Sequence, residues 1–227
     1  LSESYFDSVY EFYMIKLEAN ELIYNIYPSF IELCSSSKEK SSIYFDSILS
    51  VNLSFLASPN FSMKEFAIEG IRNLALSKPE RFNDKIPEFI SSLIELAQSN
   101  EDDSELVKTI LCAIGALSDI FISNYDFTSV IPILLKLVQN SKPYSSYALS
   151  DIIYIMKISS EKEKMISLIP TIIECFTLLS SYLNEASSQL LITNYDEVSS
   201  WTDLIRAMRH FVEFVENNSK NELYEWI

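Results

Sequence analysis

The chain repeats itself at an interval of 45 residues. Gly70 and Gly115 lie 45 residues apart, and so do Pro87 and Pro132. Glycine and proline interrupt regular structure most strongly, and the sequence has only 2 glycines and 7 prolines, so this shared spacing indicates a repeat. A repeat of about 40 to 47 residues is typical of stacked pairs of α-helices. The spacing therefore predicts a stack of helix pairs, an architecture that presents an extended binding surface.

Apolar residues recur three and four positions apart along the chain, which is the spacing of amphipathic helices. No segment shows the sustained alternation that is typical of strands. The clearest predicted repeats are 62–99, with helices from Met63 to Ser77 and from Pro87 onward, and then 104–141 and 144–183. A final unpaired helix is expected at 199–217, after a polar stretch at 184–200. Three earlier helices are expected at 3–17, at 21–34 and from Phe45 to just before Pro59, with a polar connector at 35–40.

A second repeated feature extends the pattern to the third helix pair. Residues 116–120 and 148–152 share the sequence ALSDI. About six additional residues, within 159–165, lengthen the third repeat. We expect Gly70 and Gly115 to mark points where two helices approach too closely for a side chain. Ser62, with Glu65 three residues later, and Ser104 are predicted to cap the helices that follow them.

Together these patterns predict an all-α protein, a HEAT-type α-solenoid of stacked antiparallel helix pairs. Residues 1–227 would form one segment of about five pairs. Because the sequence begins with Leu1 rather than methionine, we expect a fragment of a longer solenoid. No signal peptide is apparent, and the most apolar stretch, 168–183, contains Pro170 and Glu174. We therefore predict a soluble intracellular protein without membrane insertion.

The charge of the chain restricts its partners. It carries 17 basic and 32 acidic residues, a formal net charge of −15. Phosphate groups would be repelled by this charge, which disfavours nucleic acids and anionic membranes as main partners. Basic peptides or proteins are the electrostatically natural partners.

The residues that commonly form catalytic or metal centres are scarce. Cys34, Cys112 and Cys175 lie in apolar helical windows and are expected to be reduced core residues, and His210 is the single histidine. No phosphate loop, nucleophile elbow, metal-ligand motif or local catalytic dyad is present in the sequence. We predict no enzymatic activity, no cofactor and no metal.

Glutamates mark the predicted second helices of the pairs. In a HEAT-type stack these helices line the concave side, and a row of carboxylates there would attract a segment rich in lysine and arginine. The alternative is that each glutamate belongs to a solvated helix face. The predicted concave acidic face consists of Glu32, Glu88, Glu95 and Glu174.

The densest acidic run lies between two predicted repeats. It consists of Glu101, Asp102, Asp103 and Glu105. Carboxylates at a helix start interact favourably with the helix dipole, so this acidic loop has a structural explanation, which we rank above ligand binding. The spaced oxygen ligands of a calcium loop are missing.

The repeat sequences resemble the importin-β (karyopherin-β) family, in the carboxy-terminal half of its HEAT superhelix. The segments that carry the resemblance are 66–75 (FAIEGIRNLA) followed by Phe82, 112–120 (CAIGALSDI), 148–152 (ALSDI), and 194–198 (NYDEV) with the helix at 201–215. The resemblance implies a nuclear transport receptor that shuttles between cytoplasm and nucleus. Such a receptor holds basic cargo or adaptor segments and Phe-Gly nucleoporin repeats, and a small GTPase controls release, here through other parts of the full chain.

Phe-Gly binding would require shallow apolar pockets between neighbouring first helices. The candidate lining residues are Ile68, Leu76, Phe121 and Ile155, although apolar residues at this spacing also form helix cores. The sequence thus predicts a non-catalytic protein-binding solenoid of the importin-β type. The alternative is a HEAT-repeat scaffold or adaptor outside nuclear transport, of the vesicle-coat or phosphatase-scaffold type.

Overall fold

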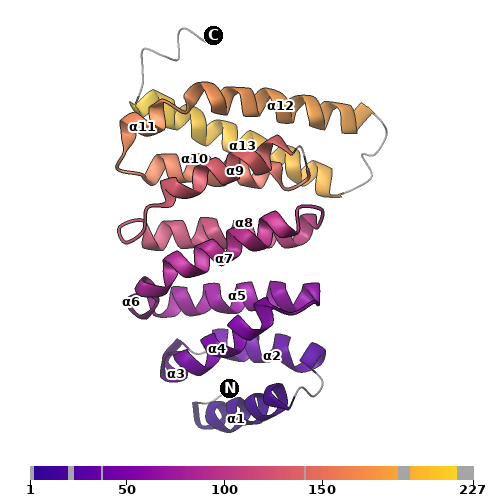
Figure 1. The fold of residues 1–227 in the computed structure, drawn as a ribbon, viewed down its shortest axis with the longest axis vertical. Coiled ribbons are helices and arrows are strands. Elements are labelled where there is room, and N and C mark those ends of the chain that lie inside the picture. The colour runs from indigo at the N-terminus through magenta and orange to yellow at the C-terminus, as the bar shows by residue number, and fades with distance from the viewer. Residues whose placement is uncertain (1–2, 20–22, 37, 141, 189–194, 219–227) are drawn as a thin grey trace. The chain divides into compact units, whose positions relative to one another are not determined.

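The computed structural model describes residues 3–19, 23–36, 38–140, 142–188 and 195–218. Every regular element in these ranges is a helix, which confirms the all-α prediction (Figure 1). The chain divides into two compact units, residues 1–89 and 90–227. Helix α7 (Ile86–Ser99) contains the point of division.

Unit 1 is built around α5 (Phe61–Ser77). This helix packs against α2 (Ile23–Ser36), α3 (Lys38–Ile43) and α4 (Phe45–Leu56), and α1 (Glu3–Glu18) packs on α2. The short helices α6 (Pro79–Phe82) and η1 (Asn83–Lys85) follow α5. Large aromatic side chains dominate the core because each removes a wide apolar area from water. Those that are fully buried are Tyr27, Phe30, Phe45 and Phe82.

Unit 2 is built around α10 (Ser145–Ile158). This helix packs against α8 (Ser104–Phe121), α9 (Ile131–Gln139), α12 (Ile169–Ser188) and α13 (Tyr195–Asn218), and α12 also contacts α9 and α13. The short helices η2 (Phe127–Val130) and α11 (Lys162–Ile166) complete the unit. Figure 1 draws α9 and α12 nearer to the viewer than α8 and α10. The buried residues of α10 include Leu149, Ile152 and Met156, on the faces that meet its neighbours.

Both glycines lie where a neighbouring helix brings a polar side chain against the backbone, as predicted. A Cβ atom added at Gly70 would overlap Asn52 Oδ1 of α4 and would lie 2.6 Å from Ile31 Cδ1 of α2. A Cβ atom added at Gly115 would lie 2.8 Å from Asp151 Oδ1 of α10. These separations are shorter than van der Waals contact, so a side chain at either glycine would require its neighbours to move.

Two of the predicted helix caps are wrong by one or two residues. The side chain of Asn60 accepts a hydrogen bond from the Met63 amide at 3.2 Å, so Ser62 lies inside α5 rather than at its cap. The side chain of Asp103 accepts a hydrogen bond from the Leu106 amide, and Ser104 is the first residue of α8. In both places two good capping residues lie close together, and the helix begins at the earlier one.

The described residues of two predicted connectors are helical, while residues 37 and 189–194 of these connectors lie outside the described ranges. Ser35 and Ser36 end α2, and Lys38–Ile43 forms α3, within and beyond the connector predicted at 35–40. The stretch predicted as polar linker at 184–200 contributes its first residues to α12, which ends at Ser188, and its last residues to α13, which begins at Tyr195. The polar residues Asn184 and Glu185 are exposed, so they continue the helix without being buried. Polarity alone was therefore a poor signal of a helix end.

Burial also corrects two predictions about single residues. Cys34 and Cys175 are buried, and burial raises the pKa of their thiols to about 12 and about 11, but Cys112 is exposed on α8. The spacing of apolar residues on α13 would place Trp201 and Met208 on its buried face, but Met208 is 44% exposed and Trp201 is only partly buried. Among the described side chains of this helix, the buried apolar ones are Leu204, Ala207, Phe211, Phe214 and Val215, and Asp203 is also buried.

Candidate functional site

The glutamates of the predicted acidic face are all exposed. Glu32 lies on α2, Glu88 and Glu95 on α7, and Glu174 on α12. Glu32, Glu95 and Glu174 form no ion pair or hydrogen bond through their side chains with any residue that the structure describes. Their charges are therefore available to a ligand from solution.

The acidic loop between α7 and α8 differs, because its carboxylates have partners within unit 2. Glu101 accepts a hydrogen bond from Asn140 at 2.9 Å, and Lys136 approaches it at 4.0 Å. Asp102 pairs with Lys142 at 3.1 Å, and this ion pair raises the pKa of the lysine. Asp103 caps α8. The remaining member, Glu105, pairs with Lys108 at 2.8 Å.

The acidic loop also borders a shallow hollow of about 530 Å³, formed by residues 99–105 alone. Because three lysines and a helix cap engage its four carboxylates, the loop has a structural role. It joins α7 to α8 and ties that connection to the residues around α9.

The residues proposed for Phe-Gly pockets lie mainly in the core. Ile68 and Phe121 are each 1% exposed and Ile155 is 0% exposed, so these side chains are enclosed by their own unit. Leu76, at 44% exposed, is the member of the set that presents apolar surface. A phenyl ring would reach the other three only if the helices around them separated.

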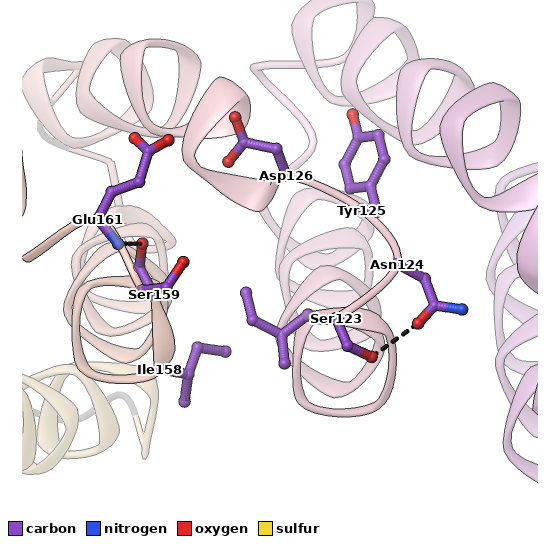
Figure 2. A pocket seen from close by; sticks show the side chains of 9 residues that line it. Ser123, Asn124, Tyr125, Asp126, Ile158, Ser159 and Glu161 are labelled. Atoms are coloured by element: carbon purple, nitrogen blue, oxygen red, sulfur yellow. Dashed lines mark hydrogen bonds between the residues drawn. The ribbon is translucent and has the colours of Figure 1, made fainter.

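One pocket lies between the loops that follow α8 and α10, with a volume of about 480 Å³. Figure 2 shows residues 123–126 on one wall and residues 158–161 on the other. Its polar groups are used to form the two turns. Asp126 accepts hydrogen bonds from the amide and the hydroxyl of Thr128, at 2.9 and 2.6 Å, and these bonds lower the pKa of its carboxyl. Likewise Ser159 accepts a hydrogen bond from the Glu161 amide at 3.1 Å.

A second pocket, of about 380 Å³, lies between α8, α10 and α13, and we call it the Asp151 pocket. Asp151 lines it, and its Oδ2 atom is buried without a hydrogen-bond partner among the described residues, although the residue as a whole is partly exposed. Burial raises the pKa of this carboxyl well above its ordinary value, because the charged form loses its hydration. The other lining residues are Cys112, Tyr147, Ser150, Tyr154, Lys157, Asp203, Arg206, Ala207 and His210.

The basic groups of the Asp151 pocket are paired with other acids. Arg206 donates to Asp203 at 2.9 Å. Lys157 contacts Glu213 at 3.2 Å and lies 3.3 Å from Nδ1 of His210. The hydrogen bonds from Lys157 and His210 lower the pKa of the Glu213 carboxyl. Among the described residues, Asp151 is thus the carboxyl group of this pocket that no basic side chain neutralises.

Sequence reasoning identified the two ALSDI segments but did not recognise Asp151 as a site residue. The signal was present, because the second ALSDI places an aspartate among apolar helical positions. Its first counterpart, Asp119, is exposed on α8 and accepts a hydrogen bond from the Tyr154 hydroxyl of α10. The difference between the two aspartates arises from the helix that packs next to each, which the motif does not encode.

Comparisons with known proteins found no match: no protein-family model, no curated protein and no solved structure matches this chain. Within the part of the chain that the structure describes, no three His, Cys, Asp or Glu side chains gather where they could hold a metal ion. The segment Lys162–Glu185 is long and apolar enough, by length and composition only, to cross a membrane. Core helices of water-soluble proteins pass the same test, and Ile172, Leu179 and Leu183 of this segment are buried within unit 2.

Proposed function

We propose that this chain is a non-catalytic HEAT-type helical solenoid that binds a basic segment of a partner protein. The observation that carries the proposal is the contrast between two groups of carboxylates. Those of the acidic loop are engaged by lysines and a helix cap, whereas Glu95 and Glu174 are exposed and form no ion pair within the described residues. Carboxylates left unpaired on a chain of net charge −15 attract cationic ligands.

The packing within unit 2 supports the solenoid interpretation. In a stack of helix pairs, first helices pack on first helices and second helices on second helices. The contacts of α10 with α8 and α13 fit the first kind, and the contact of α9 with α12 fits the second. Glu95 and Glu174 both lie on second helices in this scheme, the helices that line the concave side of a HEAT stack.

The finer proposal is a transport receptor of the importin-β type, active in cytoplasm and nucleus. It rests on the sequence motifs, with the exposed acidic residues as physical support for cargo binding. Phe-Gly binding has weaker support, since three of its four candidate residues are buried. The second candidate function is a HEAT scaffold outside transport, which the same helix packing supports. Binding of a Phe-Gly peptide by the chain would favour the transport receptor. Binding of a basic peptide without binding of a Phe-Gly peptide would favour the scaffold.

The test is titration of a fluorescent Lys/Arg-rich peptide into the purified chain at low salt. The double variant Glu95→Lys with Glu174→Lys replaces two attractions by two repulsions. Since single exposed ion pairs contribute modestly, we expect roughly 5- to 30-fold weaker binding. The matched control is Glu163→Lys with Glu216→Lys, which makes the same change in net charge at exposed positions of α11 and α13.

The control should weaken binding by about twofold or less, through the change in overall field alone. Equal weakening by both double variants would mean that net charge, and not this surface, attracts the peptide. Absence of binding by the unaltered chain, at low salt, would refute the proposed function.

A further inference from the structure

We propose that the Asp151 pocket is a binding site for an alkylguanidinium group, held by the carboxylate of Asp151. The guanidinium would belong to a small molecule or to an arginine side chain of a partner. This inference goes beyond the proposed function, because the pocket is formed by α8, α10 and α13, whereas Glu95 and Glu174 lie on α7 and α12.

The repeated ALSDI motif places two aspartates in equivalent positions of neighbouring helices. Asp119 and Asp151 hold the same place in its two copies. Asp119 receives a hydrogen bond from Tyr154, which lies on the next helix of the layer, α10. The next helix for Asp151 is α13, and no described residue of α13 donates to its buried Oδ2 atom. The described part of α13 therefore supplies no donor at the position where the preceding repeat has one.

The two glycine contacts give a second comparison. At Gly70 the polar side chain that fills the space is Asn52, which is fully buried and satisfied. Its Oδ1 atom accepts a hydrogen bond from the Tyr27 hydroxyl at 2.6 Å, and its Nδ2 atom donates to the Ile48 carbonyl at 2.7 Å. At Gly115 the corresponding side chain is Asp151, which faces a pocket and lacks a partner for Oδ2. Buried polar groups without partners are costly, and they are often found at functional sites.

The charged groups around the pocket leave Asp151 as its unmatched member. From α13, Arg206 pairs with Asp203, and His210 contacts Glu213. From α10, Lys157 contacts the same glutamate. A cation that enters the pocket would therefore meet one carboxyl group with no competing basic partner in the described structure.

The chemistry of the pocket walls favours a guanidinium. Its volume of about 380 Å³ is at the small end of ligand pockets, which suits a single side chain or a small molecule. Guanidinium donates two parallel hydrogen bonds to one carboxylate and stacks on aromatic rings, and Tyr147 and Tyr154 line the pocket. The Lys108 ammonium lies 5.9 Å from the centre of the Tyr147 ring.

Binding should release a proton. Burial raises the pKa of the Asp151 carboxyl well above its ordinary value and so favours the protonated form before a ligand binds, because the charged form loses its hydration. An entering guanidinium stabilises the carboxylate, and the proton passes to the buffer. The neighbouring titratable groups that face the pocket are Cys112 on α8, Tyr147, Tyr154 and Lys157 on α10, and Asp203 and His210 on α13.

The experiment is isothermal titration calorimetry with the full chain at neutral pH. The probes are agmatine, as a free alkylguanidinium, and N-acetyl-arginine amide, as an arginine side chain. N-acetyl-citrulline amide is the neutral control of nearly the same shape. We expect saturable binding of at least one guanidinium probe and at least tenfold weaker binding of the citrulline derivative. We also expect a net release of protons, measured in two buffers of different ionisation enthalpy. Tighter binding of agmatine or of the arginine derivative identifies the source of the guanidinium.

Asp151→Asn should weaken guanidinium binding at least tenfold and abolish the proton release, and Glu216→Gln, at an exposed position of α13, should change neither. Glu95→Lys with Glu174→Lys should leave this binding unchanged, which separates the pocket from the proposed peptide surface. Absence of saturable binding, binding that Asp151→Asn does not weaken, or equal binding of the citrulline derivative would each overturn the proposal and leave the pocket as a hydrated space.

Discussion

Replacement of Gly70 by alanine tests the helix contact that the repeat spacing predicted. The added methyl group would overlap Asn52 Oδ1 and would lie 2.8 Å from Asn52 Cγ and 2.6 Å from Ile31 Cδ1. Excess volume in a packed core costs about 1–3 kcal/mol. Displacement of Asn52 would also break its buried hydrogen bonds with Tyr27 and Ile48, at about 1–3 kcal/mol. Alanine recovers about 1 kcal/mol through its higher helix propensity, so we expect a net loss of about 3 kcal/mol.

The assay is urea unfolding of the full chain, followed by circular dichroism. Gly115→Ala is the matched control, because its Cβ atom would meet a single side chain at 2.8 Å, Asp151 Oδ1, and the next nearest atom at 3.6 Å. Rotation of that one carboxylate relieves the contact, so the gain in helix propensity should keep the control within about 1 kcal/mol of the unaltered chain. In an Asn52→Ala background the cost of Gly70→Ala should fall by at least about 1 kcal/mol, since the main clash is gone. If Gly70→Ala stabilised the chain by about 1 kcal/mol, helix propensity alone would describe this position and the close-contact argument would be refuted.

Three further predictions concern the caps, the thiols and the buried carboxyl. Asp103→Ala should lower the free energy of unfolding by about 1 kcal/mol, and Ser104→Ala should change it by less than half as much; the reverse order would restore Ser104 as the cap. With a thiol-specific chromogenic reagent at pH 8, Cys112 should react in the native chain, whereas the two buried cysteines should react only after unfolding. Burial keeps their thiols protonated and inaccessible. Rapid release of three equivalents of chromophore from the native chain would contradict this. Because the pKa of Asp151 is raised in the folded state, the unfolded state loses this proton at a lower pH. The contribution of Asp151 to the free energy of unfolding should therefore fall as pH rises above about 4, and the Asp151→Asn variant should lack this contribution. Parallel pH profiles of the two proteins would contradict the burial argument.

The helices and the glycine contacts could be predicted from the sequence because they follow from local spacing. The helix predicted from Met63 to Ser77 is α5, Phe61–Ser77, and the final helix expected at 199–217 lies within α13, Tyr195–Asn218. Apolar periodicity identifies such segments, and scarce glycines identify where they touch. Helix ends were less accurate, as at Asp103 and Ser104, because neighbouring residues can cap equally well and packing decides between them.

The candidate sites depended on tertiary neighbours, which no local pattern contains. Periodicity could not tell that Cys112 is on the exposed face of α8 while Phe121 of the same helix is in the core. The acidic loop could not be known to meet Lys142, forty residues later in the chain. Likewise the missing partner of Asp151 depends on which residues of α13 lie opposite it. These features are properties of pairs of helices rather than of single segments.

The central claim is that exposed, unpaired glutamates of the second helices bind a basic segment. Its most direct measurement is an NMR titration of the isotopically labelled chain with an unlabelled Lys/Arg-rich peptide at low salt, with backbone amide shifts followed residue by residue. We predict that the largest shift changes cluster on α7 around Glu95 and on α12 around Glu174, and that they diminish as salt is added. Shift changes confined to the acidic loop or to α8 and α13, or no saturable change at all, would contradict the account.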